Sequence, residues 1–163
     1  MTSSKSEGSV RLGMGKQSCQ HSCNSTGFNR REKMLEFFNP ESAPAPFSRY
    51  SQAVRVPEAY RWLFISGQVG CDKQQRLAPD FHSQAVLAWQ NVVAVLTAGG
   101  MSVHDLVKVT VLLTRAGDVS ASRVARDQIL QGAAPASTLM VLAGLAHPDM
   151  LIEIEAIAAK PAF

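Results

Sequence analysis

The sequence has no apolar run long enough to cross a membrane. Its most hydrophobic stretch, residues 85–98, is interrupted by Gln90, Asn91 and Thr97, whereas a transmembrane helix needs about 20 predominantly apolar residues in a row. The N-terminal residues also lack the apolar core of a secretory signal. We therefore expect a protein that has no membrane partner.

Cysteine is scarce as well. Three cysteines, an odd number, do not make a disulfide framework and favour a reducing compartment, so we expect a cytoplasmic protein. Cys19, His21 and Cys23 have types and a spacing that could bind zinc. No second Cys/His pair follows to complete a closed site, and we predict no metal site.

The net charge of most of the chain is close to zero. Residues 1–34 carry a net charge of +4, and because the whole chain is +3, residues 35–163 carry −1. The Ser-rich basic segment 1–34 is predicted to be a disordered tail, and 35–163 a single folded domain. A nearly neutral domain offers little attraction to phosphates, so we expect no nucleic-acid partner.

Hydrophobic periodicity predicts an α+β domain of order β-β-α-β-α-β-β. Asp80 and Asp118 are expected to cap the two helices, of which the second has a weak apolar set of Val119, Val124, Ile129 and Leu130. Parallel crossovers and a hairpin imply a mixed sheet with both helices on one face. The predicted strands cover residues 50–56, 62–68, 106–113, 138–143 and 151–158, and the predicted helices cover about 81–99 and 119–131.

The predicted sheet has more apolar residues than one layer of helices can cover. Trp62, Phe64 and Trp89 are expected in the core. Further apolar residues are assigned to the opposite face of the sheet, where we expect other copies of the chain to cover them. These residues are Val109, Val111, Leu139, Val141, Ile152 and Ile154.

The last predicted strand alternates apolar and acidic residues. With a period of two, Glu153 and Glu155 share one face, and Ile152 and Ile154 share the other. Two such carboxylates either lie in water or line a site, and most surface carboxylates have no special role. The alternation by itself leaves both interpretations open.

Short motifs along residues 36–160 together resemble the RidA family, also called the YjgF or reactive-intermediate deaminase family. They occur in the order and at the spacing of that family, and the ordered set is more specific than any one motif. The motifs are Tyr50-Ser51-Gln52-Ala53-Val54, Ile65-Ser66-Gly67-Gln68, Gln90-Asn91-Val92, Gly100-Met101-Ser102, Asp105 to Val111, Pro135-Ala136 and Glu153 to Ala158.

The resemblance implies a fold, an assembly and an activity. The fold is chorismate-mutase-like, assembled as a homotrimer with an inner β-barrel and with small-molecule pockets between subunits. The activity is hydrolysis of reactive enamines and imines to a carbonyl compound and ammonia, and it needs no cofactor. Since an imine is already electrophilic, such an enzyme has to position the substrate and water and to move a proton.

The resemblance also assigns roles to residues of this chain. Glu153 is the predicted catalytic residue, which orients or deprotonates water or protonates the leaving nitrogen. The predicted substrate-binding residues are Tyr50, Ser66, Gly67, Arg123, Ser137 and Thr138.

Ser137 departs from the pattern of the family. Well-studied members have an arginine after Pro-Ala, which binds the substrate carboxylate with two hydrogen bonds. A serine has no such charge, so the substrate is expected to differ from a 2-imino acid unless Arg123 points into the pocket. The other interpretation of Arg123 is an exposed arginine on the surface of a helix.

The sequence leaves three alternative functions open. A non-catalytic small-molecule-binding trimer would also fit the loss of the arginine. RNA cleavage, an activity sometimes attached to the family, has less support, because the domain is nearly neutral and no pair of histidines is spaced for acid–base chemistry on a phosphodiester. A structural protein would have its pocket filled by side chains.

Overall fold

The computed structural model describes residues 34–162. The predicted disordered tail and the possible zinc ligands Cys19, His21 and Cys23 lie outside the described residues. Two single-turn 3₁₀ helices, Val103–Asp105 and Ala116–Asp118, precede β4 and α2. The main elements are β1 (Glu36–Phe38), β2 (Ala53–Arg55), β3 (Tyr60–Val69), α1 (Phe81–Ala98), β4 (Leu106–Leu113), α2 (Val119–Leu130), β5 (Ala136–Val141) and β6 (Ile152–Pro161).

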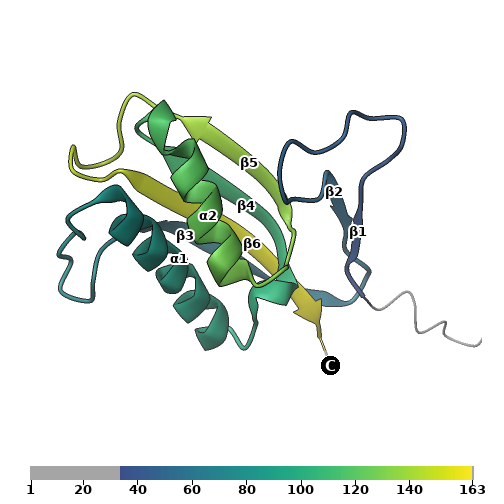
Figure 1. Cartoon of the computed structure of the whole chain (residues 1–163). Coiled ribbons are helices and arrows are strands. Elements are labelled where there is room, and N and C mark those ends of the chain that lie inside the picture. Colours follow the sequence, from purple (N-terminus) through teal and green to yellow (C-terminus); the bar gives the residue numbers. More distant parts are fainter. Residues whose placement is uncertain (1–33, 163) are drawn as a thin grey trace, which may run out of the picture.

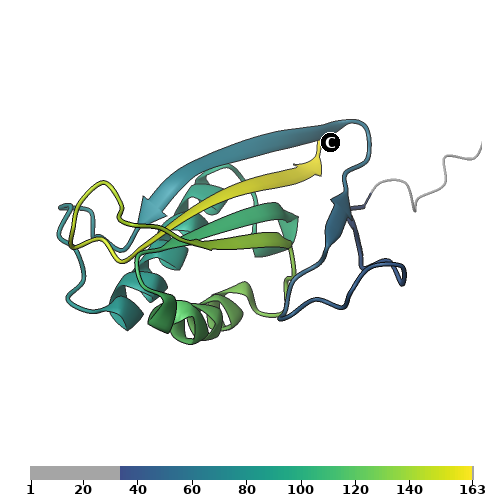
Figure 2. The same ribbon diagram turned by 90° about the horizontal axis from the view of Figure 1, so that it is seen from above.

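A four-stranded mixed sheet in the order β3-β6-β4-β5 forms the body of the domain. Strand β6 is antiparallel to both β3 and β4, whereas β5 is parallel to β4. Both helices lie on one face of this sheet (Figures 1 and 2). The predicted α+β fold, with a mixed sheet and two helices on one face, is therefore confirmed.

The first two strands form a separate arm. Strands β1 and β2 pair only with each other, and the arm extends from the end of the sheet (Figure 1). The predicted strand 50–56 is confirmed only over Ala53–Arg55, and β1 was not predicted. The residues after β1 are rich in proline, so the local sequence does not predict a strand there. Residues Glu36–Phe38 form a strand because they pair with β2, and an ion pair between Arg55 and Glu36 at 2.6 Å reinforces this pairing.

The final two strands are neighbours in sequence but not in the sheet. Strand β6 enters between β3 and β4, while β5 lies at the edge. The loop between β5 and β6 therefore crosses over β4 instead of making a hairpin. This arrangement puts the Glu153 strand in the centre of the sheet, with a neighbouring strand on each side.

Helix α1 is built as its sequence predicts. The Asp80 carboxylate accepts a hydrogen bond from the Ser83 backbone N–H at 2.9 Å, and this bond lowers the pKa of Asp80. Phe81, Trp89 and Leu96 are buried on the side that faces the core. The helix packs against β3, β6 and α2.

Helix α2 differs from its prediction. Asp118 gives no side-chain cap to the helix and instead pairs with Arg115 at 3.0 Å. Val124, predicted to be apolar contact surface, is 53% exposed. The buried positions are Ser122, Ala125, Arg126 and Leu130, which recur at the spacing of one helical face.

The two faces of the sheet also differ from the prediction. Val109, Val111, Ile152 and Ile154 were assigned to the face without helices, but they are buried beneath the helices in a single copy. The assignment was wrong because strand alternation fixes which residues share a face and does not say which face the helices cover.

The face without helices carries different apolar side chains. Trp62 is 49% exposed and Phe64 is 72% exposed, and their rings stack with centroids 6.4 Å apart. Both were predicted to lie in the core, as Trp89 does. In a single copy of the chain they form part of an exposed apolar surface.

Candidate functional site

Glu153 and Gly67, two residues of the predicted site, are in contact on the face without helices. Gly67 lies where the pairing of β3 with β6 shifts between Ile65 and Gln68. A Cβ added to Gly67 would come within 1.7 Å of the Glu153 carboxylate oxygen Oε1. The absence of a side chain at Gly67 therefore lets the half-buried carboxylate of Glu153 lie directly on the backbone of β3.

Ser66 belongs to the same irregular part of β3. Its carbonyl oxygen accepts a hydrogen bond from the Gln68 side chain at 3.0 Å. Ser66 and Gly67 are both exposed. The Ser66–Gly67 backbone and the Glu153 carboxylate therefore form one polar, accessible surface, which we call the Glu153 surface.

A second group of predicted residues lines a cavity on the other side of the sheet. The cavity has a volume of about 250 Å³ and is lined by residues of α2, of β4 and β5, and of the segment between β1 and β2. Tyr50, Arg123 and Ser137, all predicted to bind substrate, line it together. The remaining lining residues are Phe47, Ser48, Val111, Ser122, Arg126 and Leu139.

Backbone contacts explain why Tyr50 lies beside the start of β5. The next residue, Ser51, donates its backbone N–H to the carbonyl oxygen of Ala134 at 3.0 Å and forms an isolated parallel bridge with Ala136. These bonds place the end of the arm against Ser137, which follows Ala136. The sequence motifs around Tyr50 and around Pro135-Ala136 thus meet in space.

Arg126 is a cavity residue that was not predicted. It is only 7% exposed, and its guanidinium contacts Asp127 Oδ1 at 2.8 Å. Arg123, which was predicted, is exposed and also lines the cavity. Arg126 lies on the same buried face of α2 as Ser122, Ala125 and Leu130. The sequence identifies Arg126 as a candidate only after this buried face is known.

The two groups of site residues lie on opposite faces of the sheet in one copy. Val111, which lines the cavity, is buried beneath the helices. Its neighbour Leu112 pairs in register with Glu153 on the other face. Thr138 also lies on that other face, where its hydroxyl accepts a hydrogen bond from Lys108. A single copy therefore does not join the Glu153 surface to the cavity.

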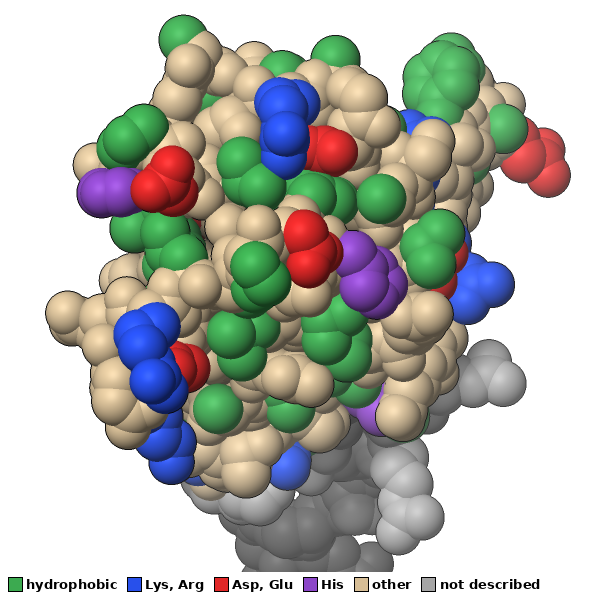
Figure 3. All heavy atoms as spheres, turned by 60° about the vertical axis from the view of Figure 1, so that its left-hand side comes forward, with side chains coloured by type: hydrophobic (Ala, Val, Ile, Leu, Met, Phe, Trp, Pro, Cys, Tyr) green, Lys and Arg blue, Asp and Glu red, His purple; other side chains and the backbone are tan. Residues whose placement is uncertain are grey.

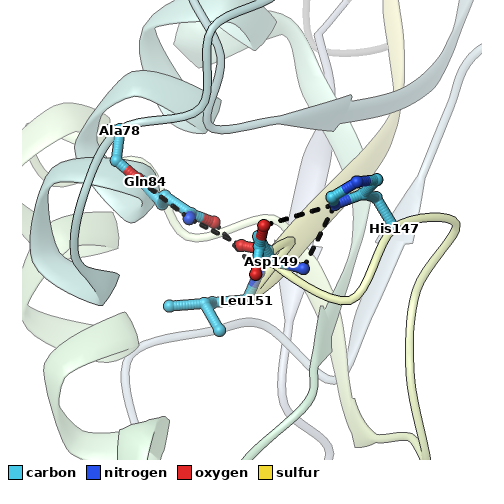
Figure 4. Close-up of polar contacts among 5 residues, drawn as sticks. All are labelled: Ala78, Gln84, His147, Asp149 and Leu151. Atoms are coloured by element: carbon cyan, nitrogen blue, oxygen red, sulfur yellow. Dashed lines mark hydrogen bonds and ion pairs between the residues drawn. The ribbon is translucent and has the colours of Figure 1, made fainter.

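A larger cavity of about 550 Å³ lies at the far end of the sheet, between the loops that precede α1 and β6. Its buried Gln84 donates hydrogen bonds to the carbonyl oxygens of Ala78 and Asp149 and accepts one from the Leu151 N–H (Figure 4). These bonds tie the two loops together. The cavity contains none of the predicted site residues, so we take the smaller cavity as the candidate binding site.

The surface at this far end has mixed polarity. Figure 3 shows acidic, basic and hydrophobic side chains interspersed over it. His147 and Asp149 lie beside each other in the loop before β6, with the His147 Nδ1 atom 3.8 Å from a carboxylate oxygen of Asp149 (Figure 4).

Other residues have structural roles. The side-chain amide of Asn91 donates hydrogen bonds to the backbone carbonyl oxygens of Val69 and Cys71 at 3.0 Å each. Within residues 34–162 there is no group of three His, Cys, Asp or Glu side chains that could hold a metal ion. Among the helices of that part of the chain, none is both long and apolar enough to span a membrane.

The sequence of this chain is similar to those of known proteins. A family model described as Endoribonuclease L-PSP matches residues 40–160. The 2-iminobutanoate/2-iminopropanoate deaminase of Mus musculus is 37% identical over 123 residues, which are 74% of this chain and 88% of that protein.

Solved structures extend the comparison to the fold. A conserved Rid protein of Yersinia pestis superposes with a TM-score of 0.69 at 29% identity, over 76% of this chain and 97% of that one. Escherichia coli TdcF with bound serine superposes with a TM-score of 0.57 at 29% identity, over 77% and 98%. The fold, the order of the motifs and these matches agree, and the chain belongs to the RidA (YjgF) family.

Proposed function

We propose that this protein hydrolyses small enamines or imines to a carbonyl compound and ammonia, at sites formed between copies of the chain in a homotrimer. The position of Glu153 carries the proposal. Its carboxylate lies against the backbone of Gly67 on an accessible sheet face, where it can exchange protons with a bound ligand or water. The related mouse protein is named for the deamination of two imines, which supports this class of reaction.

The proposed reaction needs only water and proton transfer. Glu153 takes a proton from water as the oxygen bonds to the carbon of the C=N group, and the nitrogen takes up a proton. The C–N bond then breaks, ammonia leaves and a carbonyl group remains. An enamine first accepts a proton on carbon to become the imine. Positioning and acid–base catalysis are sufficient because the imine carbon is already electrophilic.

The arrangement of the predicted site residues on the two faces of the sheet supports the proposed assembly. Glu153 and the cavity that holds Tyr50 and Ser137 are separated by the sheet in one copy. A second copy can bring its own cavity to the Glu153 surface of the first. The exposed Trp62 and Phe64 support such packing, because an apolar surface on this face is stabilised when a partner buries it.

The first experiment compares two neighbouring carboxylates. Purified protein is mixed with 2-iminopropanoate or 2-iminobutanoate formed in situ, or with an imine that lacks a carboxylate, and carbonyl release is followed. We expect Glu153→Gln to lower kcat by about 10²-fold or more. Glu155→Gln, which changes an exposed carboxylate on the same strand face, should leave the rate nearly unchanged. An undiminished rate in Glu153→Gln would exclude the proposed role of this carboxylate.

The second experiment tests whether two copies form one site. Glu153→Gln and Ser137→Phe, which places a ring in the cavity, are each expected to be inactive alone. Random mixed assembly should restore up to about a quarter of the wild-type activity, because some sites then combine an intact carboxylate with an intact cavity. If both groups of residues act within one copy, no mixed assembly contains an intact site and activity stays absent.

A non-catalytic binding trimer is the second candidate function. The TdcF structure contains bound serine, which shows that this fold can hold a small molecule. Saturable binding of a small ligand without turnover of any of the three imines would select this function over hydrolysis.

A further inference from the structure

We infer that Arg126 is the anion-binding residue of the cavity and that it binds the carboxylate of a small substrate. The inference rests on the proposed function, since it names the substrate group that the same site takes. It places the positive charge on helix α2 instead of at the start of β5, where Ser137 lies. It also assigns the charge to a residue other than Arg123.

The burial of Arg126 is the first observation. Arg126 lies on the inner face of α2 and is 7% exposed, although arginine is rarely buried without a paired anion. Ser122 and Ala125, on the same helical face, are small and buried. Their size leaves space for the long side chain between the helix and the sheet.

The hydrogen bonds of Arg126 are the second observation. Its Nε donates to Asp127 Oδ1 at 2.9 Å, and its Nη2 contacts the same oxygen at 2.8 Å. Within residues 34–162, Asp127 is the only polar partner of this guanidinium, so Nη1 has none there. A guanidinium has five N–H donors in a fixed plane, and two contacts to one oxygen leave donors for a second anion.

The composition of the cavity wall is the third observation. Two arginines and no Asp or Glu line the cavity, and Asp127 is not part of the wall. Hydroxyl groups supply further donors, and apolar side chains keep the local dielectric low, which strengthens a charge-assisted hydrogen bond. The hydroxyl-bearing residues are Ser48, Tyr50, Ser122 and Ser137, and the apolar ones are Phe47, Val111 and Leu139.

Arg126 is better placed than Arg123 for this role. Arg123 is exposed, so its side chain loses rotamer freedom when it binds a ligand. Arg126 is already held by burial and by Asp127, and a preorganised donor binds with less loss of entropy. A planar fork also fits the two oxygens of a carboxylate.

The experiment measures binding of pyruvate to the full chain by titration calorimetry, with pyruvamide as the uncharged analogue. We expect pyruvate to bind at least about tenfold more tightly than pyruvamide, as one charge-assisted pair would give. Arg126→Gln should remove that difference. Arg76→Gln, the matched control, removes an arginine that lies outside the cavity and pairs with Asp72, and it should change pyruvate affinity by less than about threefold. Equal pyruvate affinity in wild type and Arg126→Gln would overturn the inference, and so would phosphate that competes as well as pyruvate does.

A second variant covers the case in which Arg126→Gln does not fold. Asp127→Asn keeps the cation and removes the carboxylate that competes for it. Pyruvate affinity should therefore rise by about threefold. An unchanged or lower affinity in this folded variant would contradict the inference.

Binding and turnover separate this inference from the proposed function. Arg126-dependent pyruvate binding without imine hydrolysis would reject the proposed activity and keep the role of Arg126. Imine hydrolysis with pyruvate binding that does not depend on Arg126 would reject the anion-binding role and keep the activity.

Discussion

The two faces of the four-stranded sheet have different tasks. On the face beneath the helices, Val109, Ile152 and Ile154 are fully buried in a single copy. On the other face, Glu153 lies on Gly67 and the large Phe64 side chain is exposed. One face accounts for the stability of the single domain. The other carries the proposed proton-transfer group and an apolar surface that a partner copy can cover.

Among the variants that test the difference between the two faces, Gly67→Ala is expected to have the largest effect. The added methyl group would overlap the Glu153 carboxylate, which has to move. A displacement of about 1 Å at a reacting group can lower kcat on the order of 10²-fold, and we expect a loss of that size in the imine assay with little change in thermal midpoint. Gly117→Ala is the control, because a Cβ there meets no atom within 4 Å. Full activity of Gly67→Ala would show that the contact does not matter.

The second prediction compares two isoleucines of β6 on opposite faces. Ile154→Ala removes a fully buried side chain and should lower the free energy of unfolding by about 2–5 kcal/mol in urea titrations. Ile157→Ala, on the half-buried opposite face, should cost about 1 kcal/mol or less at low protein concentration. Its cost should increase with protein concentration if copies associate through this face. Equal costs that do not depend on concentration would remove the distinction between the faces.

The third prediction tests association through the face without helices. Phe64→Ser should weaken self-association by about tenfold or more, because a large apolar side chain is then lost from the contact surface. Sedimentation velocity over a range of concentrations measures this. Val124→Ser changes an exposed apolar residue on the outside of α2 and should leave association unchanged. The reverse ranking of the two variants would place the contact on the helices.

The smallest expected effect concerns Lys108, which also lies on the face without helices. Partial burial lowers the pKa of its ammonium group below the ordinary value of 10.5, and Glu155 opposes this shift. Between the lowered pKa and 10.5 the unfolded chain binds more protons than the folded one. The stability contributed by Lys108 therefore rises with pH through that window.

Lys108→Met removes the charge and gives this prediction its test. The stability of the variant relative to wild type should be highest at neutral pH and should fall as the pH rises toward 10.5. Urea titrations between pH 7 and 10.5 measure the difference. A difference that does not change with pH would show that Lys108 is not desolvated on folding.

Those features of the candidate site that depend on local sequence patterns could be predicted from the sequence. The alternation around Glu153 correctly separates the acidic residues from Ile152 and Ile154, and the roles assigned to Glu153, Tyr50 and Ser137 through the family resemblance remain predictions. Arg126 was not found, because a charged residue at a buried helical position contradicts the pattern used to identify that face. Which face of the sheet the helices cover was also missed, because a period of two is the same whichever face is covered.

The sequence by itself determined the helices, the four strands of the main sheet and which residues of each strand share a face. These features depend on the spacing of apolar side chains and on local capping. Only the tertiary structure decided that β6 lies between β3 and β4, that the Glu153 surface and the arginine-lined cavity lie on opposite sides of the sheet, and that Arg126 is buried. Strand order and helix placement depend on contacts between residues far apart in the chain, which no local spacing records.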